Sequence, residues 1–526
     1  MTPRFLPAGD TALLVELADL DAVLALFASL GADLPPGVIE LVPAARTLAV
    51  TFDRHLTTAE RLATEIAGRD LTARPEGGGR EVEIPVIYDG QDLAEVAALT
   101  GLSEAEVIRR HADTPWRAAF TGFAPGFCYL TGGDPVLAVP RRQSPRTAIP
   151  AGSVALAGEF SGVYPKQSPG GWQIIGTTPM PMWDLSRSPP ARIAPGDLVR
   201  FVPHTGRNLS APRPASPAPD AAAPEARLDI VSAPFPALFQ DAGRLSQLAQ
   251  GVAASGAADM GAFRALNRLL GNPAGTAAVE IGAGPLKLRA SRACTLAVTG
   301  ADRQITVNGG PGFATHCPIP VDAGDEIAIG APRNGCYSYL GARGGFVVTP
   351  VLGSAATDTL AQIGPEALRA GGWIGLANGP AQALGPAEPV PLLPKPGALI
   401  VVDVIPGPRA DWFPPEALKL FTAQDWLVTP RSSRIGKRLE GTPLHRNDSR
   451  ELPSEATMTG AIQVPHSGQP VLFLPDHPLT GGYPVIATVV ADHLDLAAQV
   501  PPGARLRFRP RIPFAATLPD RPEVSR

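Results

Sequence analysis

A stretch near the middle of the chain lacks the large apolar residues that a folded core requires. Residues 210–224 are mainly Pro, Ala and Ser, and none of them is a large apolar residue. Since nothing in this stretch can be buried to offset the entropy of ordering it, we expect a disordered, semi-extended linker over residues 206–226. The 526 residues therefore divide into two proteins fused in one chain.

Both halves are predicted to be rich in short strands. The 55 Gly and 60 Pro residues separate short apolar runs such as 199–202 and 472–474, a pattern typical of sandwiches and barrels. The N-terminal region differs, because a strand at 47–52 lies between two helical patterns at 19–31 and 57–68. We expect a mainly β protein with a small α+β N-terminal domain.

An internal echo connects the two halves. Residues 195–201, Pro-Gly-Asp-Leu-Val-Arg-Phe, resemble residues 502–508, Pro-Gly-Ala-Arg-Leu-Arg-Phe. The segments before them also match, at 151–176 and 459–488. The period is too long for a solenoid, so the echo predicts one type of β-barrel domain used more than once.

Charge, hydropathy and cysteine content exclude several classes of function. Charged residues are 18% of the chain and the formal net charge is −4, which leaves no basic field for nucleic acid or an anionic membrane. No apolar run approaches membrane-spanning length and no signal peptide is visible, so we expect a cytoplasmic protein. The four Cys residues lack ligand spacing, which predicts reduced thiols and no metal site.

Ordered motifs in the first half carry a family resemblance. They lie at 122–130 (Gly-Phe-Ala-Pro-Gly-Phe-Cys-Tyr-Leu), 139–147, 150–154 and 164–172 (Tyr-Pro-Lys-Gln-Ser-Pro-Gly-Gly-Trp). Residues 4–204 resemble the family of 5-oxoprolinase B-type subunits, which is also called the Kip-type kinase inhibitor or allophanate hydrolase subunit 1 family.

The second half resembles the family of 5-oxoprolinase C-type subunits over residues 228–510. This family is also called allophanate hydrolase subunit 2 or the biotin-dependent carboxyltransferase-like family. The motifs lie at 239–244, 256–259, 270–273, 279–281, 352–358, 433–441, 460–465 and 480–484.

The resemblance implies several cyclophilin-like β-barrels. The predicted division is an α+β domain (1–80), a cyclophilin-like barrel (81–205), the linker (206–226), a first barrel domain of the C-like half (227–390), a second cyclophilin-like barrel (391–512) and a tail (513–526).

Candidate binding residues of the first half centre on Arg141, Arg142 and Arg146. Guanidinium groups bind carboxylates or phosphates in a bidentate manner, and nearby glycines let backbone N–H groups approach an anion. The alternative is that they form surface ion pairs. His111, at the end of a predicted helix, is either a general base or a helix-terminal residue that the dipole favours. The further candidates are Ser153, Gly170, Gly171 and Trp172.

In the second half, polar residues stand among glycines and apolar runs. Asp241, Asp259 and Asp476 are the candidate catalytic carboxylates, which could help to polarise an amide carbonyl or stabilise an oxyanion. The alternative is that Asp–Arg pairs hold the loops of the barrels. Candidate substrate- or nucleotide-binding residues are Gln240, Arg244, Glu280, Ser433, Arg434, Arg438, Gln463, Thr480, Gly481, Gly482 and Tyr483.

The resemblance implies an ATP-dependent opening of 5-oxoproline to glutamate, with Mg-bound ATP as co-substrate and a separate A-type subunit of 5-oxoprolinase as partner. No Met-Lys-Met stretch is present, so we expect no biotin on this chain. We also expect the two halves to associate, and leave homo-oligomerisation open. Two alternatives remain: the carboxyltransferase component of a biotin-dependent urea or amide carboxylase, and a non-catalytic regulator that binds a histidine kinase.

Overall fold

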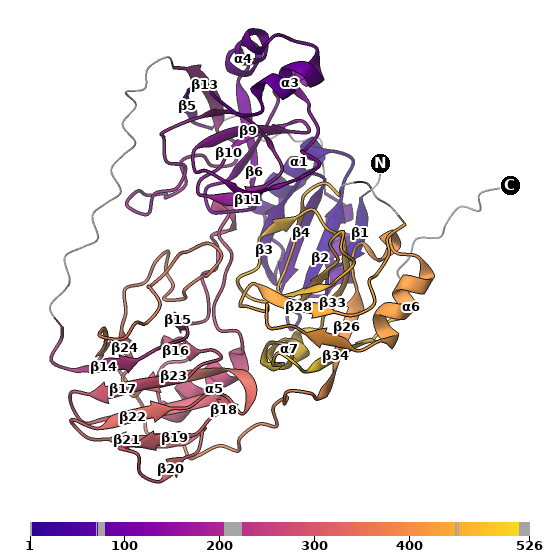
Figure 1. Ribbon diagram of the computed structural model, residues 1–526. Helices are drawn as coiled ribbons and strands as arrows, with labels where there is room; N and C mark the ends of the chain where they lie inside the picture. The colour runs from indigo at the N-terminus through magenta and orange to yellow at the C-terminus, as the bar shows by residue number, and fades with distance from the viewer. Residues whose placement is uncertain are drawn as a thin grey trace.

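The computed structural model describes residues 3–69, 71, 79–204, 223–447, 450 and 452–514. Most of the predicted linker, residues 206–222, lies outside these ranges. The predicted fold class is confirmed, because strands dominate both halves and helices are few (Figure 1). The predicted residue boundaries of the domains stay a proposal.

The N-terminal region is a four-stranded antiparallel sheet in the order β1-β2-β4-β3, with two helices. Asp19 and Thr58 cap the helices by accepting hydrogen bonds from Ala22 N and Arg61 N, as expected for N-cap residues. The apolar sides of sheet and helices share a core that includes Val15, Leu26 and Leu62. The elements are β1 (Arg4–Pro7), β2 (Ala12–Glu16), α1 (Leu20–Ala32), β3 (Val38–Pro43), β4 (Thr47–Phe52) and α2 (Ala59–Ala67).

A seven-stranded sheet in the order β12-β9-β10-β7-β6-β13-β5 follows. A bridge between Ile87 and Thr177 connects the ends of the two outermost strands. The elements are β5 (Glu81–Val86), α3 (Leu93–Thr100), α4 (Glu104–Asp113), β6 (Trp116–Thr121), β7 (Cys128–Thr131), β8 (Arg146–Ile149), β9 (Ser153–Ala157), β10 (Phe160–Val163), β11 (Ser168–Gly170), β12 (Gln173–Thr177) and β13 (Leu198–Pro203), with β8 and β11 paired apart from the main sheet.

The C-terminal half begins with two sheets that share one core. Apolar side chains from both sheets, such as Leu228, Val298 and Ile327, belong to this core. The first sheet contains β14 (Arg227–Ser232), β17 (Leu286–Ala290), β19 (Ile305–Val307), β20 (Gly312–Phe313), β22 (Glu326–Ile329), β24 (Phe346–Val347) and β25 (Trp373–Leu376). The second contains β15 (Ala237–Gln240), β16 (Ala278–Ile281), β18 (Cys294–Asp302), β21 (Pro318–Val321) and β23 (Asn334–Ala342), and α5 (Met260–Leu270) packs on it.

The last sheet closes into a barrel in the order β26-β33-β30-β31-β28-β27-β34. Its elements are β26 (Leu399–Pro406), α6 (Pro415–Ala423), β27 (Trp426–Val428), β28 (Gly436–Glu440), β30 (Ala461–Gln463), β31 (Val471–Phe473), β33 (Val485–Val489), α7 (Leu494–Gln499) and β34 (Arg505–Pro510), with β29 (Glu455–Ala456) and β32 (Thr480–Gly481) paired beside it.

The internal echo is structural as well as sequential. The two matching segments are β13 and β34, and each pairs in parallel with the first strand of its own sheet, β5 or β26. Each also pairs antiparallel with the strand after the helices, β6 or β27. The same pairing scheme therefore occurs in both sheets, and in the C-terminal half it closes the barrel.

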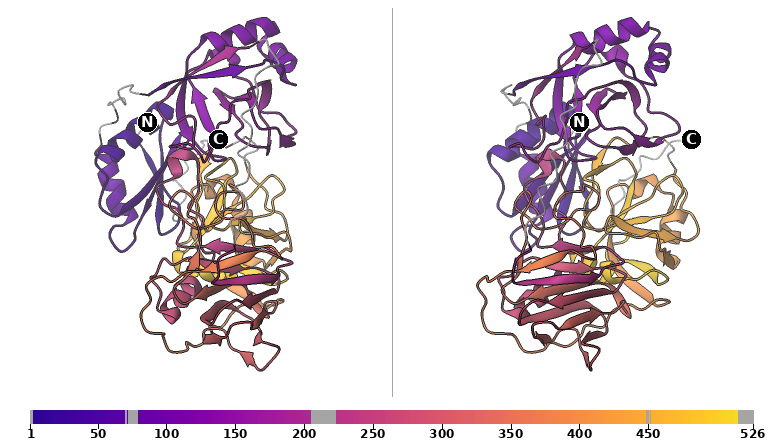
Figure 2. Two further views of the ribbon diagram at one scale, coloured as in Figure 1. Left: turned by 90° about the vertical axis from the view of Figure 1, so that its left-hand side faces the viewer. Right: turned by 60° about the vertical axis from the view of Figure 1, so that its left-hand side comes forward.

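The two halves contact each other directly. Ala456 of β29 is buried in one cluster with Leu14 of β2 and Ala49 of β4. In a turned view the barrel of the C-terminal half lies against the N-terminal half, above the two-sheet region (Figure 2). This packing brings loops from both halves together.

Candidate functional site

A cavity of about 670 Å³ lies between the two halves. The N-terminal half lines it with residues 123–125 and 166–169. The C-terminal half contributes Asp358 and its loop, together with the face of the barrel between Ile435 and Tyr483. Such a volume is typical of a site for a small molecule or cofactor.

A lysine and a carboxyl group approach the cavity from opposite halves. Lys166 donates a hydrogen bond to the carbonyl oxygen of Leu360, which joins the halves. Burial lowers the pKa of Lys166, and the nearby Asp358 partly offsets this effect. Asp358 is buried and accepts hydrogen bonds from Leu360 N (2.9 Å) and Ala361 N (2.8 Å). Burial, followed by repulsion from Asp476, raises the pKa of Asp358 to about 6, a value suited to a general acid or base.

One amide on the cavity wall has an unused donor. The Gln463 side chain is buried, and its Nε2 has no hydrogen-bond partner among the described residues. A Cβ at position 481 would lie 2.5 Å from this Nε2, so only glycine leaves the amide in place. A buried amide N–H without a partner costs free energy unless a ligand satisfies it. Gln463 is therefore placed to donate to the carbonyl oxygen of a bound ligand.

His477 also lines the cavity and is held in one tautomer. Its Nδ1 lies 2.9 Å from the carbonyl oxygen of Pro478, which can only accept, so Nδ1 carries the proton. Burial lowers the pKa of His477 and keeps the ring neutral. Nε2 is then an acceptor, and it has no hydrogen bond to the described residues.

A buried charged network supports the loop of Asp358. Arg434 contacts Glu280 and donates to Asp476 from Nε (3.0 Å) and Nη2 (2.9 Å). Burial alone would raise the pKa of Asp476, but Arg434 outweighs burial and lowers it. Asp476 in turn accepts from Thr359 N (2.9 Å) and Oγ1 (2.7 Å), which fixes the residue beside Asp358.

The other predicted carboxylates of the C-terminal half have local partners. Asp241 accepts from Gly243 N, Ser354 Oγ and Ala355 N, and so holds a loop. Asp259 caps α5 through Ala262 N, and burial, followed by Asp495, raises its pKa to about 6. Neither lines the cavity between the halves.

The remaining polar candidates of this half are placed as follows. Gln240 donates to Thr357 O at 2.8 Å, and Arg244 contacts Ala356 O, so both support the loop before Asp358. Arg438 and Tyr483 line the large cavity, whereas Ser433 lines a different one.

A second, smaller cavity of about 120 Å³ collects several candidates from both halves. Thr480 Oγ1 accepts a hydrogen bond from Phe123 N across the boundary. Gly170–Gly171 and Gly481–Gly482, which lie in the two similar sequence segments, therefore line the same cavity. The lining candidates are Arg141, Gly170, Gly171, Trp172, Thr480, Gly481 and Gly482.

Arg142 and Arg146 are not part of either cavity. Both form ion pairs with the buried Asp92 at the start of α3, at 2.8 Å for Arg142 and 2.7 Å for Arg146. This geometry matches the structural alternative for these two arginines. Ser153 is buried in β9 and lines none of these cavities.

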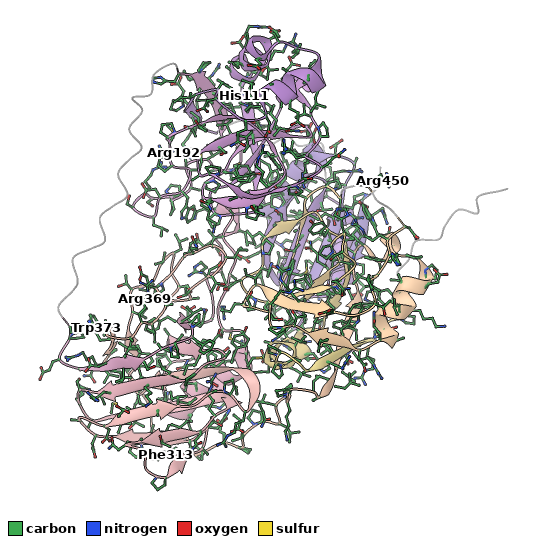
Figure 3. All side chains as sticks on the ribbon, viewed as in Figure 1. His111, Arg192, Phe313, Arg369, Trp373 and Arg450 are labelled. Atoms are coloured by element: carbon green, nitrogen blue, oxygen red, sulfur yellow. The ribbon has the colours of Figure 1, made fainter. Side chains whose placement is uncertain are left out.

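His111 lies on the buried face of α4, in a part of the molecule remote from the C-terminal half (Figure 3). Its ring nitrogens bond to Tyr88 Oη (2.8 Å) and Ser161 Oγ (2.9 Å), and burial lowers its pKa to about 3. The second barrel has a phenylalanine in the matching position. His111 O accepts from Trp116 Nε1 and the His111 ring stacks on Phe201, just as Phe421 O accepts from Trp426 Nε1 and its ring stacks on Phe508. These contacts are those of a core residue.

Sequence reasoning did not select the cavity residues Lys166 and Asp358, and it placed His477 beside Asp476 in a candidate cleft without giving it a role. All three lie inside or beside motifs that carry the family resemblance. Their position in glycine- and proline-rich loops could have pointed to them, because an ionisable residue in such a loop is rarely needed for packing of the core.

The described residues contain no helix long and apolar enough to cross a membrane.

Comparisons with known proteins agree with this architecture. Residues 3–193 match the family model "Carboxyltransferase domain, subdomain C and D", and residues 250–510 match "Carboxyltransferase domain, subdomain A and B". The chain is 42% identical to the B-type subunit of 5-oxoprolinase from Bacillus subtilis over 182 residues, which are 32% of this chain and 76% of that relative. It is 32% identical to the C-type subunit of 5-oxoprolinase from Escherichia coli over 285 residues, which are 53% of this chain and 90% of that relative.

One solved structure spans both halves. The crystal structure of TTHA0988 aligns with a TM-score of 0.83 and 32% identity, and the alignment covers 95% of this chain and 100% of that one.

Proposed function

Since the chain belongs to the carboxyltransferase-domain family and joins two halves related to the B-type and C-type subunits of 5-oxoprolinase, we propose that it is the fused B and C component of a 5-oxoprolinase. The reaction is the ATP-dependent opening of 5-oxoproline to glutamate, carried out together with a separate A-type subunit. One observation carries this proposal: the cavity between the halves is lined by family motifs from both of them.

The ring amide would bind with its carbonyl oxygen toward Gln463 Nε2, which satisfies the unused donor. Its carboxylate would meet the cationic side chains of Lys166 and Arg438, both of which line the same cavity. Hydrogen bonding to the carbonyl and charge neutralisation of the carboxylate together orient the lactam.

Proton transfer would fall to Asp358 and His477. The pKa of Asp358, about 6, allows it to accept or donate a proton near neutral pH. His477 Nε2 can accept a hydrogen bond from an attacking water, because Nδ1 already carries the proton.

We propose ATP with Mg as co-substrate of the complex, and it would supply the phosphoryl group that activates the lactam. Among the described residues no group of three or more His, Cys, Asp or Glu side chains could hold a metal. A Mg ion would therefore rely largely on phosphate oxygens and water, as it commonly does.

A reconstituted assay tests the proposal. The chain is combined with the purified A-type subunit, ATP, Mg and 5-oxoproline, and released glutamate is measured. We expect glutamate well above that from the partner protein without this chain. Lys166→Met should lower kcat/KM by about 10–100-fold, the loss of one hydrogen bond to a charged group. Lys287→Met, at an exposed position on β17, is the matched control and should retain full activity. Glutamate no higher than the partner protein releases without this chain would refute the proposal.

The description of the family model favours a second candidate, the transfer of a carboxyl group to an amide nitrogen. The same cavity would then receive carboxybiotin from a partner. Carboxylation of an amide in the presence of a biotin carboxylase and its biotinylated carrier, without glutamate release, would support this candidate.

A further inference from the structure

Lysine is rare in this chain. Of the 45 basic residues only five are lysines: Lys166, Lys287, Lys395, Lys419 and Lys437. Three of them, Lys287, Lys395 and Lys419, are exposed, as is usual for lysine. Lys437 is 2% exposed. Arginine cannot lose its proton in a protein, so a buried lysine offers a chemistry that the other basic residues lack.

Lys437 lines a cavity of about 450 Å³ within the C-terminal half, between the two-sheet region and the barrel. The walls are largely apolar and include Phe235, Leu238 and Pro501. This cavity is separate from the one between the halves. Lys437 and Arg438 are adjacent on β28, where successive side chains point to opposite faces, and Arg438 lines the other cavity.

The amine of Lys437 has no carboxylate partner among the described residues. Nζ donates to Val500 O at 2.7 Å and contacts Cys336 Sγ at 3.6 Å. The ring of Tyr337 lies 5.7 Å from Nζ. The nearest buried charges on the cavity wall, Arg434 and Glu280, are paired with each other. An ammonium would need three acceptors, whereas a neutral amine needs two and keeps a lone pair, so the two contacts suit the neutral form.

Burial lowers the pKa of Lys437 and outweighs the opposing effect of the Cys336 thiol. A desolvated neutral lysine in an apolar pocket is a nucleophile toward carbonyl carbon.

We propose that this cavity is a second small-molecule site, in which Lys437 captures apolar aldehydes or ketones as a reversible imine. The Nζ lone pair attacks the carbonyl carbon and forms a carbinolamine. Loss of one water molecule, made of the carbonyl oxygen and the two amine protons, leaves the C=N bond. No oxidant or reductant takes part, and water reverses the reaction.

The walls define the class of ligand. An aromatic or aliphatic substituent is buried against Phe235 and Leu238. A carboxylate would lose its hydration there and could meet only the exposed Arg333, because the buried Arg434 is already paired with Glu280. The site therefore prefers an apolar aldehyde such as benzaldehyde to glyoxylate, a similar electrophile that carries a charge.

Reductive trapping tests the proposal on the full chain. The protein is incubated at pH 7 with benzaldehyde and sodium cyanoborohydride, and the modified lysines are identified by peptide mass spectrometry over time. We expect Lys437 to be labelled at least about tenfold faster than Lys287, Lys395 or Lys419, because a larger fraction of its amine is unprotonated. Glyoxylate should reverse this preference.

Two variants complete the test. Lys437→Met keeps the volume and removes the amine, so fast labelling should disappear. Lys287→Met should lose one slow site only. Labelling of Lys437 no faster than of the exposed lysines, or equal labelling by benzaldehyde and glyoxylate, would overturn the proposal. If Lys437→Met fails to fold, the labelling rates of the lysines in the unsubstituted chain are sufficient to test the proposal. Since no oxoprolinase activity is measured, the result is independent of the proposed function.

Discussion

The Arg409 guanidinium and the Glu16 carboxylate lie 2.9 Å apart although 393 positions separate them in the chain. Arg409 also donates from Nε to both oxygens of Glu455, at 2.9 and 3.0 Å, and both Arg409 and Glu455 are buried. Burial alone would lower the pKa of Arg409, but the two carboxylates outweigh it and raise it. The ion pairs tie the N-terminal sheet to the barrel of the other half without the linker.

We therefore expect the halves to stay associated after the linker is cut. A protease site placed within residues 210–220 should, after cleavage, yield two fragments that co-elute in size-exclusion chromatography. Arg409→Ala should weaken the association by about 2–5 kcal/mol, because it removes the partly buried ion pair with Glu16 that joins the halves. Arg4→Ala, which removes a more exposed partner of Glu16, should cost less than about 1 kcal/mol. Separation of the cleaved but otherwise unchanged fragments would contradict this role.

The proposed role of Asp358 predicts a pH dependence. With its pKa raised to about 6, Asp358 is mainly ionised at pH 7 and becomes protonated as the pH falls below 6. If it acts as a base, kcat/KM for 5-oxoproline should fall below pH 6, and Asp358→Asn should lower kcat by about 10²–10⁴. A pH profile measured on the reconstituted complex checks this. An unchanged acidic limb in an active Asp358→Asn variant would assign the limb to another group.

Gly481→Ala should damage substrate binding with little effect on folding. The added methyl group meets Gln463 Nε2 and displaces the proposed donor to the lactam carbonyl. We expect KM for 5-oxoproline to rise by about tenfold or more, in line with the loss of one hydrogen bond. Gly31→Ala is the control, since nothing lies within 4 Å of its added methyl group, and KM should not change.

His111 should affect stability rather than catalysis. Its pKa is about 3 in the folded protein, below the usual value near 6.5, so the unfolded chain binds more protons between these limits. The stabilisation is fully present above pH 6.5 and is lost as the pH falls toward 3. Urea unfolding of the isolated chain at several pH values should show this slope, and His111→Gln should reduce it.

The same variant separates the two roles of this histidine. His111→Gln in the reconstituted complex should keep the acidic limb near pH 6, because that limb belongs to Asp358 in our proposal. If the acidic limb of the pH profile disappears in His111→Gln, His111 acts as a general base after all.

The family, the mainly β fold and the internal echo could be read from the sequence, because each is a local pattern repeated over many residues. The capped helices at Asp19 and Thr58 follow the same logic. Side-chain partners could not be predicted in this way. Arg142 and Arg146 were expected to bind an anion, and the anion that they meet is Asp92, which lies 50 and 54 positions away in the chain.

Members of the proposed site were missed for a related reason. Asp358 is unusual only because folding buries it near Asp476, and Lys166 only because the other half covers it. The effect on Lys166 requires both halves, whereas the effect on Asp358 requires the two domains of the C-terminal half to pack together. Gln463, Gly481 and Tyr483 were selected through motifs, and these motif residues line the cavity between the halves.

The parallel pairing of first and last strands sets an order for synthesis. The seven-stranded sheet of the N-terminal half can complete its last pair, β5 with β13, as soon as residue 203 has left the ribosome. In the second barrel, β26 cannot pair with β34 until residues 505–510 emerge. Until then the edges of β26 and β27 that face β34 stay unpaired. Nascent chains that stop before residue 505 therefore carry a folded N-terminal half and an open sheet with unpaired strand edges. A chaperone or a protease would recognise this open sheet.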